Sequence, residues 1–215
     1  THSVSFSEEK RINHEKIGGI IPPAEYGAEP HDRYAALRHL INGGEMMFAK
    51  VNSLGLFGLN AFPVDVEISV SKGIPRFEIV GLADTAVQES RERIKSALYA
   101  CGIVFPTSSC IVNLAPADLR KNGSMHDLAI FMAILAALGR VQVPQDAAII
   151  GEVSLNGDVR RVNGVLPMTL KAKEQGIKTM YVPQENAKEA AVVEGMTVFG
   201  VPNAKALLAH LEDET

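Results

Sequence analysis

Residues 113–128 of the chain read NLAPADLRKNGSMHDL. They follow a short apolar run, SCIVNL at 109–114, which predicts a buried strand, and they lead into DLAIFMAILAAL at 127–138, which predicts a helix covered on most sides. A loop at the carboxyl end of a strand is exposed yet rigidly held, and α/β folds place their chemistry there. This stretch therefore fixes where a functional site is to be sought.

The residues before this stretch predict an antiparallel sheet and one helix. Positions 62–70 alternate apolar and polar side chains, the pattern of a half-buried strand, and 48–56 is expected to be a strand of the same sheet. The Lys72-Gly73 pair predicts a turn into a partner strand at 76–80. Asp84 or Thr85 is expected to cap the next helix, which ends at Gly102.

The residues after it predict a hairpin followed by alternating helices and strands. The hairpin covers 149–162, and its Asn156-Gly157 pair suits a type I′ turn. The later elements are expected at 167–175, 179–182, 184–193, 197–201 and 204–211. A sheet of neighbouring strands at the front and helix–strand alternation at the back predict an α+β fold with a mixed sheet.

Bulk composition indicates a cytoplasmic globular protein. The chain has 215 residues, 47% of them hydrophobic, and a formal net charge of −4, which argues against a protein that coats nucleic acid. Its two cysteines, Cys101 and Cys110, cannot make a disulfide framework and are expected to be buried thiols. No apolar run approaches the roughly 18–20 residues that span a bilayer, so no membrane contact is expected.

Residues 1–45 differ from the rest and are expected to be a poorly structured extension, with residues 46–215 as the domain. The Met46-Met47 pair directly before a clear strand suggests a natural start at that point, and one short helix is plausible at 32–41. The extension holds four of the six histidines: His2, His14, His31 and His39. Their spacing does not favour a metal site over solvated side chains.

The candidate chemistry lies in the 113–128 stretch. The chain has neither a P-loop, GxxxxGK[ST], nor a GxGxxG sequence after a strand, so neither usual nucleotide-binding device is present. Ser124 stands at the start of a predicted helix, where a nucleophile activated by a lysine base could sit, and Lys171 or Lys173 could supply that base. Ser124 is equally suited to cap the helix, and the two lysines fit a solvated face.

Three segments of the chain, in order, resemble one known family. They are LGLFGLNAFPVDVEISVSKGIPRFEIVGLADTAVQESRERIKSAL, IVNLAPADLRKNGSMHDLAIFMAILAAL and GEVSLNGDVRRVNGVLP. From about Met47 to Leu211, the sequence resembles the N-terminal domain of the magnesium-chelatase-like AAA+ ATPases, the YifB/ComM family linked to competence. The resemblance implies a Lon-protease-like domain of the ribosomal protein S5 domain 2 type.

The same resemblance tests the serine–lysine pair. In Lon-type proteases the serine lies in a Lys-Asp-Gly-Pro-Ser-Ala-Gly-like turn, and the alignment with Lys121-Asn122-Gly123 puts Met125 at the serine. The catalytic lysine follows a Gly-Gly-Leu-like segment after a hairpin, and Leu166 takes its place. Neither replacement can act as nucleophile or base, so the resemblance implies a lost dyad and no catalytic residue in this chain.

The turn is then expected to serve structure or partners. Asp118 and Asp127 could accept backbone amides around a tight turn at Gly123. Basic side chains are candidates for contact with DNA or a partner, although a solvated helix face explains those of 85–100 equally well. These candidates are Arg91, Lys95, Arg120, Lys121, Arg160 and Arg161.

The resemblance implies a non-catalytic domain of a hexameric AAA+ motor, which engages DNA or a partner, or assembles the ring, during DNA uptake and recombination. ATP and Mg²⁺ are expected to bind only an ATPase module outside this chain, and the expected partners are that module, neighbouring subunits and DNA. No cofactor and no metal are expected in the chain itself. The alternative is a residual peptidase that uses Ser124 with Lys171 or Lys173.

Overall fold

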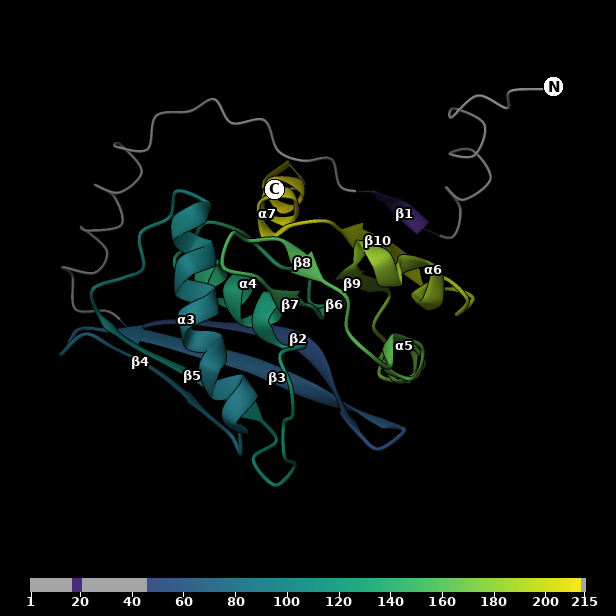
Figure 1. The fold of residues 1–215 in the computed structure, drawn as a ribbon, viewed down its shortest axis with the longest axis horizontal. Coiled ribbons are helices and arrows are strands. Elements are labelled where there is room, and N and C mark those ends of the chain that lie inside the picture. The colour runs from purple at the N-terminus through teal and green to yellow at the C-terminus, as the bar shows by residue number, and fades with distance from the viewer. Residues whose placement is uncertain (1–16, 21–45, 214–215) are drawn as a thin grey trace.

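The computed structural model describes residues 17–20 and 46–213, which form an α+β fold around an eight-stranded mixed sheet (Figure 1). The strands of this sheet are β1 (Ile17–Ile20), β2 (Met47–Phe57), β3 (Asn60–Ser71), β4 (Arg76–Val80), β5 (Ser109–Ala115), β6 (Ala147–Ile149), β9 (Thr179–Pro183) and β10 (Thr197–Val201). The helices are α3 (Thr85–Ala100), α4 (Asp127–Ala137), α5 (Val165–Glu174), α6 (Ala187–Ala190) and α7 (Ala204–Asp213), with a 3-10 turn η1 (Gln184–Asn186). The predicted α+β class and mixed sheet are confirmed.

The sheet joins an antiparallel half to a parallel half. Its spatial order is β1-β10-β9-β6-β2-β3-β5-β4. β2, β3 and β5 are antiparallel neighbours, whereas β6, β9, β10 and β1 continue from β2 as parallel strands. The 113–128 stretch leaves β5 and enters α4, so it starts at the carboxyl end of a strand as the sequence predicts.

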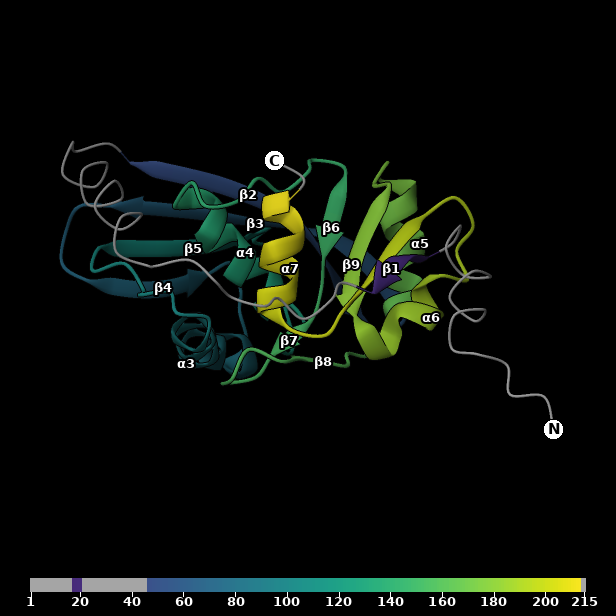
Figure 2. The ribbon, with the colours of Figure 1, turned by 90° about the horizontal axis from the view of Figure 1, so that it is seen from above.

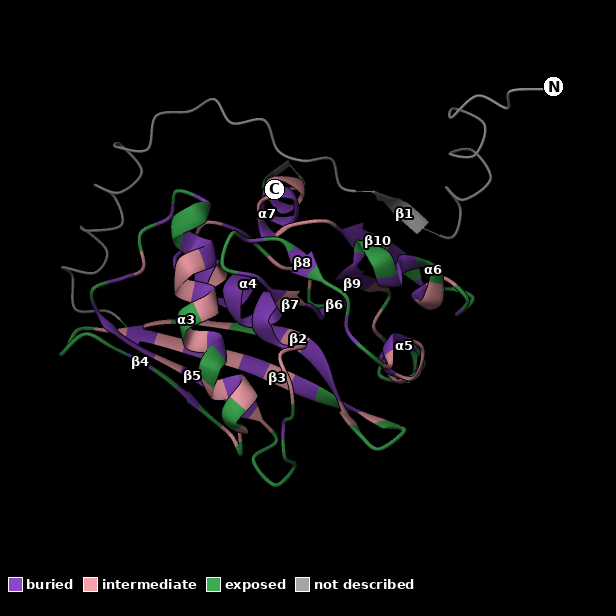
Figure 3. Ribbon diagram, viewed as in Figure 1, coloured by how far each residue is buried: buried purple, intermediate pink, exposed green. Residues whose placement is uncertain are grey.

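Helices on the two faces of the sheet bury two apolar clusters. α3, α4 and α7 cover one face (Figure 2). On the other face, α5 packs against β2, β3 and β9, and α6 packs against β9 and β10. The predicted alternation of β3 is confirmed, because Val64, Val66 and Ile68 point into the first cluster and are fully buried. Figure 3 shows this alternation along the antiparallel strands.

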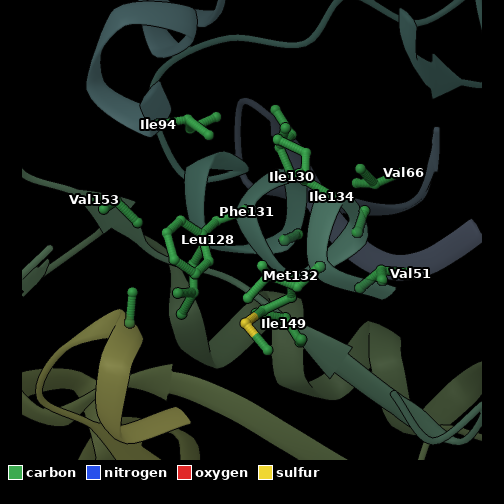
Figure 4. Packing of buried hydrophobic residues seen from close by; sticks show 14 of the residues in the cluster. Val51, Val66, Ile94, Leu128, Ile130, Phe131, Met132, Ile134, Ile149 and Val153 are labelled. Atoms are coloured by element: carbon green, nitrogen blue, oxygen red, sulfur yellow. The ribbon is translucent and has the colours of Figure 1, made fainter. Parts of the chain in front are cut away.

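α4 is the centre of the larger cluster. Apart from Ala136, each residue of this helix is buried, because α4 packs against β2, β3 and α3 at once. Figure 4 shows Leu128, Phe131 and Met132 of α4 among side chains from β2, β3, β6 and α3. The prediction of a helix covered on most sides is confirmed.

The partner predicted for β4 is wrong. β4 pairs in parallel with β5 and forms the edge of the sheet, because the chain crosses over through α3 and inserts β5 between β3 and β4. Glycine is required directly after β4, because the backbone there passes close to the backbone of β5. A Cβ atom at Gly81, whose φ is +101°, would lie 2.2 Å from the carbonyl oxygen of Leu114.

The hairpin is present as a separate two-stranded sheet, β7 (Glu152–Val153) and β8 (Val159–Arg160), but its predicted turn type is wrong. A type I′ turn needs positive φ at both central residues, and only Gly157 (φ +90°) has it. The Gly157 N–H donates to the Ser154 carbonyl, 2.9 Å, and the Ser154 hydroxyl donates to the Asn156 side chain. The tight turn therefore covers residues 154–157, with Leu155 and Asn156 at its centre.

Two further predictions differ from the structure or fall outside it. The helix expected at 184–193 is divided into η1 and the short α6, and it ends at Ala190. Within the first 45 residues, the structure describes β1, which pairs in parallel with β10. The helix expected at 32–41 and the four histidines of the extension lie outside the described residues.

Candidate functional site

Asp84, at the start of α3, contacts the strand-to-helix turn although it lies outside residues 113–128. Asp84 caps that helix as predicted, since Oδ1 accepts the Val87 N–H at 2.9 Å. Its Oδ2 accepts the N–H of Gly123 at 3.1 Å. Asp118 was expected to accept a backbone amide of this turn, but Asp84 does so instead. Asp118 is exposed. Only the fold brings residues 84 and 123 together.

Lys121 does not project from the rim as expected, because its side chain is fully buried. Its ammonium group donates to the carbonyl of Pro116, and its backbone pairs with Ala83 beyond the end of β4. Desolvation lowers the pKa of Lys121, and the nearby carboxylate of Asp118 opposes that effect. Of the two adjacent basic residues, only Arg120 is exposed.

Asp127, at the end of the turn, makes side-chain contacts with three other residues. Its side chain is fully buried, and Oδ2 forms an ion pair of 2.7 Å with Nε of Arg93, which reaches over from α3. The hydroxyl of Ser90 donates to Oδ1, and the N–H of Val153 in β7 donates to Oδ2 at 3.4 Å. Asp127 therefore ties α3 and β7 to the first turn of α4, instead of capping the local turn as predicted.

The electrostatics of this pair follow from its burial. Burial raises the pKa of Asp127, and the hydrogen bonds from Arg93 and Ser90 oppose that rise. The hydrogen bond to Asp127 raises the pKa of Arg93 in turn. Arg93 is not one of the basic residues predicted to contact DNA or a partner. On a helix it is expected to point away from Arg91 and Lys95. No local pattern indicates its partner Asp127, which lies 34 residues away.

His126 is a second buried polar group in the turn. It precedes α4, and its Nδ1 lies 3.2 Å from the hydroxyl of Ser53 on β2, while Nε2 has no hydrogen-bond partner. Burial lowers the pKa of His126 to about 4, and the positive charge of Lys121 lowers it further. The imidazole is therefore neutral at pH 7, where an unpaired buried nitrogen costs less than a buried charge.

The residues of the alternative serine–lysine pair have other partners. The hydroxyl of Ser124 donates to Glu152, whose other carboxylate oxygen forms an ion pair of 3.3 Å with Arg160. Ser124 thus joins the turn to the hairpin, and the prediction that it caps α4 is wrong: the residue at the cap position is His126. Lys171 pairs with Glu174 at 2.9 Å, and Lys173 donates to the carbonyl of Glu194 at 2.7 Å.

The two positions that the Lon-type pattern reserves for serine and lysine are brought to the same part of the molecule. Met125 and Leu166 both pack against the smaller apolar cluster, between α5 and the sheet. The N–H of Leu166 donates to the carboxylate of Glu189 at 3.0 Å, and the carbonyl of Met125 accepts the N–H of Gly151 at 2.8 Å. Both side chains are therefore built into the packing as apolar groups.

The basic candidates do not form one patch. Arg91 donates to the backbone carbonyls of Gln88 and Phe77, and Lys95 forms an ion pair with Glu92 at 3.3 Å. These contacts reduce the charge that α3 presents to a partner. On the hairpin, Arg161 is exposed beside the paired Arg160. Arg120 and Arg161 are thus the more available of the six candidates.

Two features are absent from the described part of the chain. Within residues 17–20 and 46–213, no group of three or more His, Cys, Asp or Glu side chains has the geometry to hold a metal ion. Across the same residues, none of the helices is both long and apolar enough to cross a membrane.

Replacement of Asp127 by asparagine should lower the free energy of unfolding by about 3 kcal/mol, because Arg93 would keep its charge in a mostly buried position without a counterion. The matched control is Glu92→Gln, which breaks the exposed pair with Lys95 and should cost less than about 0.5 kcal/mol. Urea unfolding at pH 7 measures both. Equal costs for the two variants would contradict the role assigned to Asp127.

His126 should make the protein less stable as the pH falls from about 6.5 to about 4. The unfolded chain takes up a proton near the ordinary pKa of 6.5, while the folded chain resists it until about 4, a difference worth about 3 kcal/mol. Asp127 acts in the opposite direction and is unchanged in His126→Gln, so the difference between the two proteins isolates the histidine. Urea unfolding from pH 7.5 to 4.5 should show a flatter pH dependence in the variant. Parallel curves would disprove the assignment.

Comparison with known proteins places the chain in a family. The model for the ChlI subunit of magnesium chelatase matches residues 66–186, which is more than half of the chain. YifB of Escherichia coli is 34% identical over 169 residues, which cover 78% of this chain and 33% of YifB. Competence protein ComM of Haemophilus influenzae is 35% identical over 156 residues, 72% of this chain and 30% of ComM.

A more distant similarity reaches the Lon proteases. Lon protease of Acinetobacter baumannii is 26% identical over 176 residues, 76% of this chain and 22% of the protease. The chain spans about a third of the length of YifB and of ComM. The family match and the identities above 30% show that the chain belongs to the magnesium-chelatase-like family that includes YifB and ComM.

Proposed function

We propose that this chain is a non-catalytic domain of a magnesium-chelatase-like AAA+ ATPase, and that it makes contacts with neighbouring subunits or partners. One observation carries the proposal. Met125 and Leu166, which the sequence resemblance aligns with the Lon-type serine and lysine, both pack against one apolar cluster. A thioether and an isobutyl group offer neither a nucleophile nor a base.

The finer description of the fold belongs to the same proposal. The order of a three-stranded antiparallel unit, a buried helix and a parallel second half supports a Lon-like domain of the ribosomal protein S5 domain 2 type. The similarity to Lon proteases over 76% of the chain supports it as well. In such a protein, ATP and Mg²⁺ bind to the remaining two thirds, and the present domain contributes to ring assembly.

The residual peptidase is less well supported. Ser124 would need a desolvated lysine as its base. Its hydroxyl instead donates to Glu152, and Lys171 and Lys173 are held by Glu174 and by the backbone of Glu194. Ser124 also stands one residue from the position of the Lon-type serine.

A fluorophosphonate probe tests the absence of catalysis. The chain should remain unlabelled at a probe concentration that labels a known serine hydrolase in the same tube, because Lys171 and Lys173 have other partners and Ser124 has no lysine base. The matched variant is Ser124→Ala. Labelling of the wild-type chain that disappears in Ser124→Ala would establish the peptidase and refute the proposal.

DNA engagement is a second candidate role, favoured by the similarity to a competence protein. Arg120 and Arg161 are the side chains best placed for it, since both are exposed. Phosphate contacts strengthen as salt is reduced, so binding should be greatest at low ionic strength.

Fluorescence anisotropy with single-stranded and branched DNA measures this role. At about 50 mM salt, the double variant Arg120→Ala/Arg161→Ala should bind several-fold more weakly than the wild type and show a smaller salt dependence. Lys178→Ala, which removes an exposed charge paired with Asp146, is the control and should bind as the wild type does. Absence of wild-type binding at that salt concentration would exclude the DNA role.

A further inference from the structure

The chain contains four Asn-Gly pairs, at 42–43, 122–123, 156–157 and 163–164. This dipeptide is chemically labile, because glycine has no side chain to shield its peptide nitrogen from the carboxamide of the preceding asparagine. The first pair lies outside the described residues. The asparagines of the other three are all exposed, so access to water does not distinguish them.

The reaction to which such a pair is prone is deamidation. The peptide nitrogen of the glycine loses its proton and attacks Cγ of the asparagine, and the new N–Cγ bond closes a succinimide ring. The Cγ–Nδ2 bond breaks, and the nitrogen leaves with the proton as ammonia. Water then adds to either carbonyl of the ring and opens it to aspartate or to isoaspartate. The reaction therefore needs a peptide N–H that can lose its proton and a carboxamide that can turn toward it.

The pair at 122–123 is protected at its nucleophile. The N–H of Gly123 donates to Oδ2 of Asp84 at 3.1 Å. A hydrogen bond to a carboxylate is strong, and the negative charge of the acceptor opposes loss of the proton from the nitrogen. The peptide nitrogen of Gly123 is therefore a poor nucleophile.

The pair at 156–157 is protected at both reacting groups. The N–H of Gly157 donates to the carbonyl of Ser154 at 2.9 Å, which holds the proton on the nitrogen. Nδ2 of Asn156 donates to the carboxylate of Asp158 at 2.7 Å, and Oδ1 accepts the hydroxyl of Ser154. The carboxamide is thus fixed through both its nitrogen and its oxygen, and these bonds must break before it can turn toward Gly157.

The pair at 163–164 has neither protection. It lies in the connection from β8 to α5 (Figure 1). Within the residues that the structure describes, no hydrogen bond engages the carboxamide of Asn163 or the N–H of Gly164. Gly164 is also the N-cap of α5, where the partial positive charge of the helix terminus favours a nitrogen that has lost its proton.

We propose that Asn163 is a site of spontaneous deamidation, and that the fold protects Asn122 and Asn156 from the same reaction. The product replaces a neutral carboxamide with a carboxylate two residues after Arg161, one of the two side chains proposed to contact DNA. Isoaspartate also lengthens the main chain by one methylene directly before Gly164. The packing there is tight, because a Cβ atom on Gly164 would lie 2.3 Å from Cδ1 of Leu56.

Peptide mapping by mass spectrometry tests the proposal, because replacement of –NH2 by –OH changes the mass of the peptide that carries each asparagine. The full chain is incubated at about pH 8, folded in one sample and unfolded in concentrated urea in the other. The urea sample gives the reactivity of each pair without the fold. In the folded chain, Asn163 should react within several-fold of its rate in urea. Asn122 and Asn156 should be slowed about tenfold or more, because their hydrogen bonds must break first.

Two variants and one enzyme serve as controls. Asn163→Gln should abolish the mass change of its peptide, because glutamine would have to close a larger ring. Asp158→Ala removes an exposed side chain that holds Asn156, and should accelerate Asn156 several-fold without a change at Asn163. An isoaspartyl methyltransferase detects isoaspartate, the product that only the ring yields. Circular dichroism checks that each folded sample stays folded.

Three outcomes would overturn the inference. The first is a folded chain in which Asn163 is slowed as much as Asn122. The second is a folded chain in which Asn122 or Asn156 reacts as fast as Asn163. The third is aspartate without isoaspartate at position 163, which indicates direct hydrolysis. All three are independent of the fluorophosphonate and DNA-binding results, so they leave the proposed function in place.

Discussion

The ion pair between Asp127 and Arg93 is the interaction on which the rest of the site depends. Its carboxylate stands at the first residue of α4, the most deeply buried helix, and accepts hydrogen bonds from α3 and β7. A charge in that position must be compensated, since desolvation of a lone carboxylate costs several kcal/mol. The ion pair therefore links α3 to the first residue of α4, directly after the turn.

Partly buried polar contacts hold the turn in place. Asp84 accepts the amide of Gly123, Lys121 donates to Pro116, and Ser124 donates to Glu152. Such a network gives rigidity to a loop that would otherwise be mobile. Met125 of the turn and Leu166 of α5 both pack against the smaller apolar cluster, so the turn also has an apolar contact with that half of the fold.

Local pattern predicted much of the fold. The alternation of 62–70 identified β3, the apolar run of 127–138 identified α4, and Asp84 was recognised as a helix cap. The wrong predictions concern how strands pair and how they are joined by turns. Nothing in residues 72–80 indicates that β5 inserts beside β4. The Asn156-Gly157 pair does not reveal that the hairpin turn is closed by the backbone bond from Gly157 to Ser154.

The sequence by itself determined most of the elements and the family resemblance, because these depend on residue type and spacing along the chain. The tertiary structure alone decided which charges are available. It buried Lys121, paired Arg93 with a residue 34 positions away, and directed Arg91 onto backbone carbonyls. The physical reason is that the fate of a charged side chain depends on its solvation and on partners distant in sequence, and neither is encoded in local periodicity.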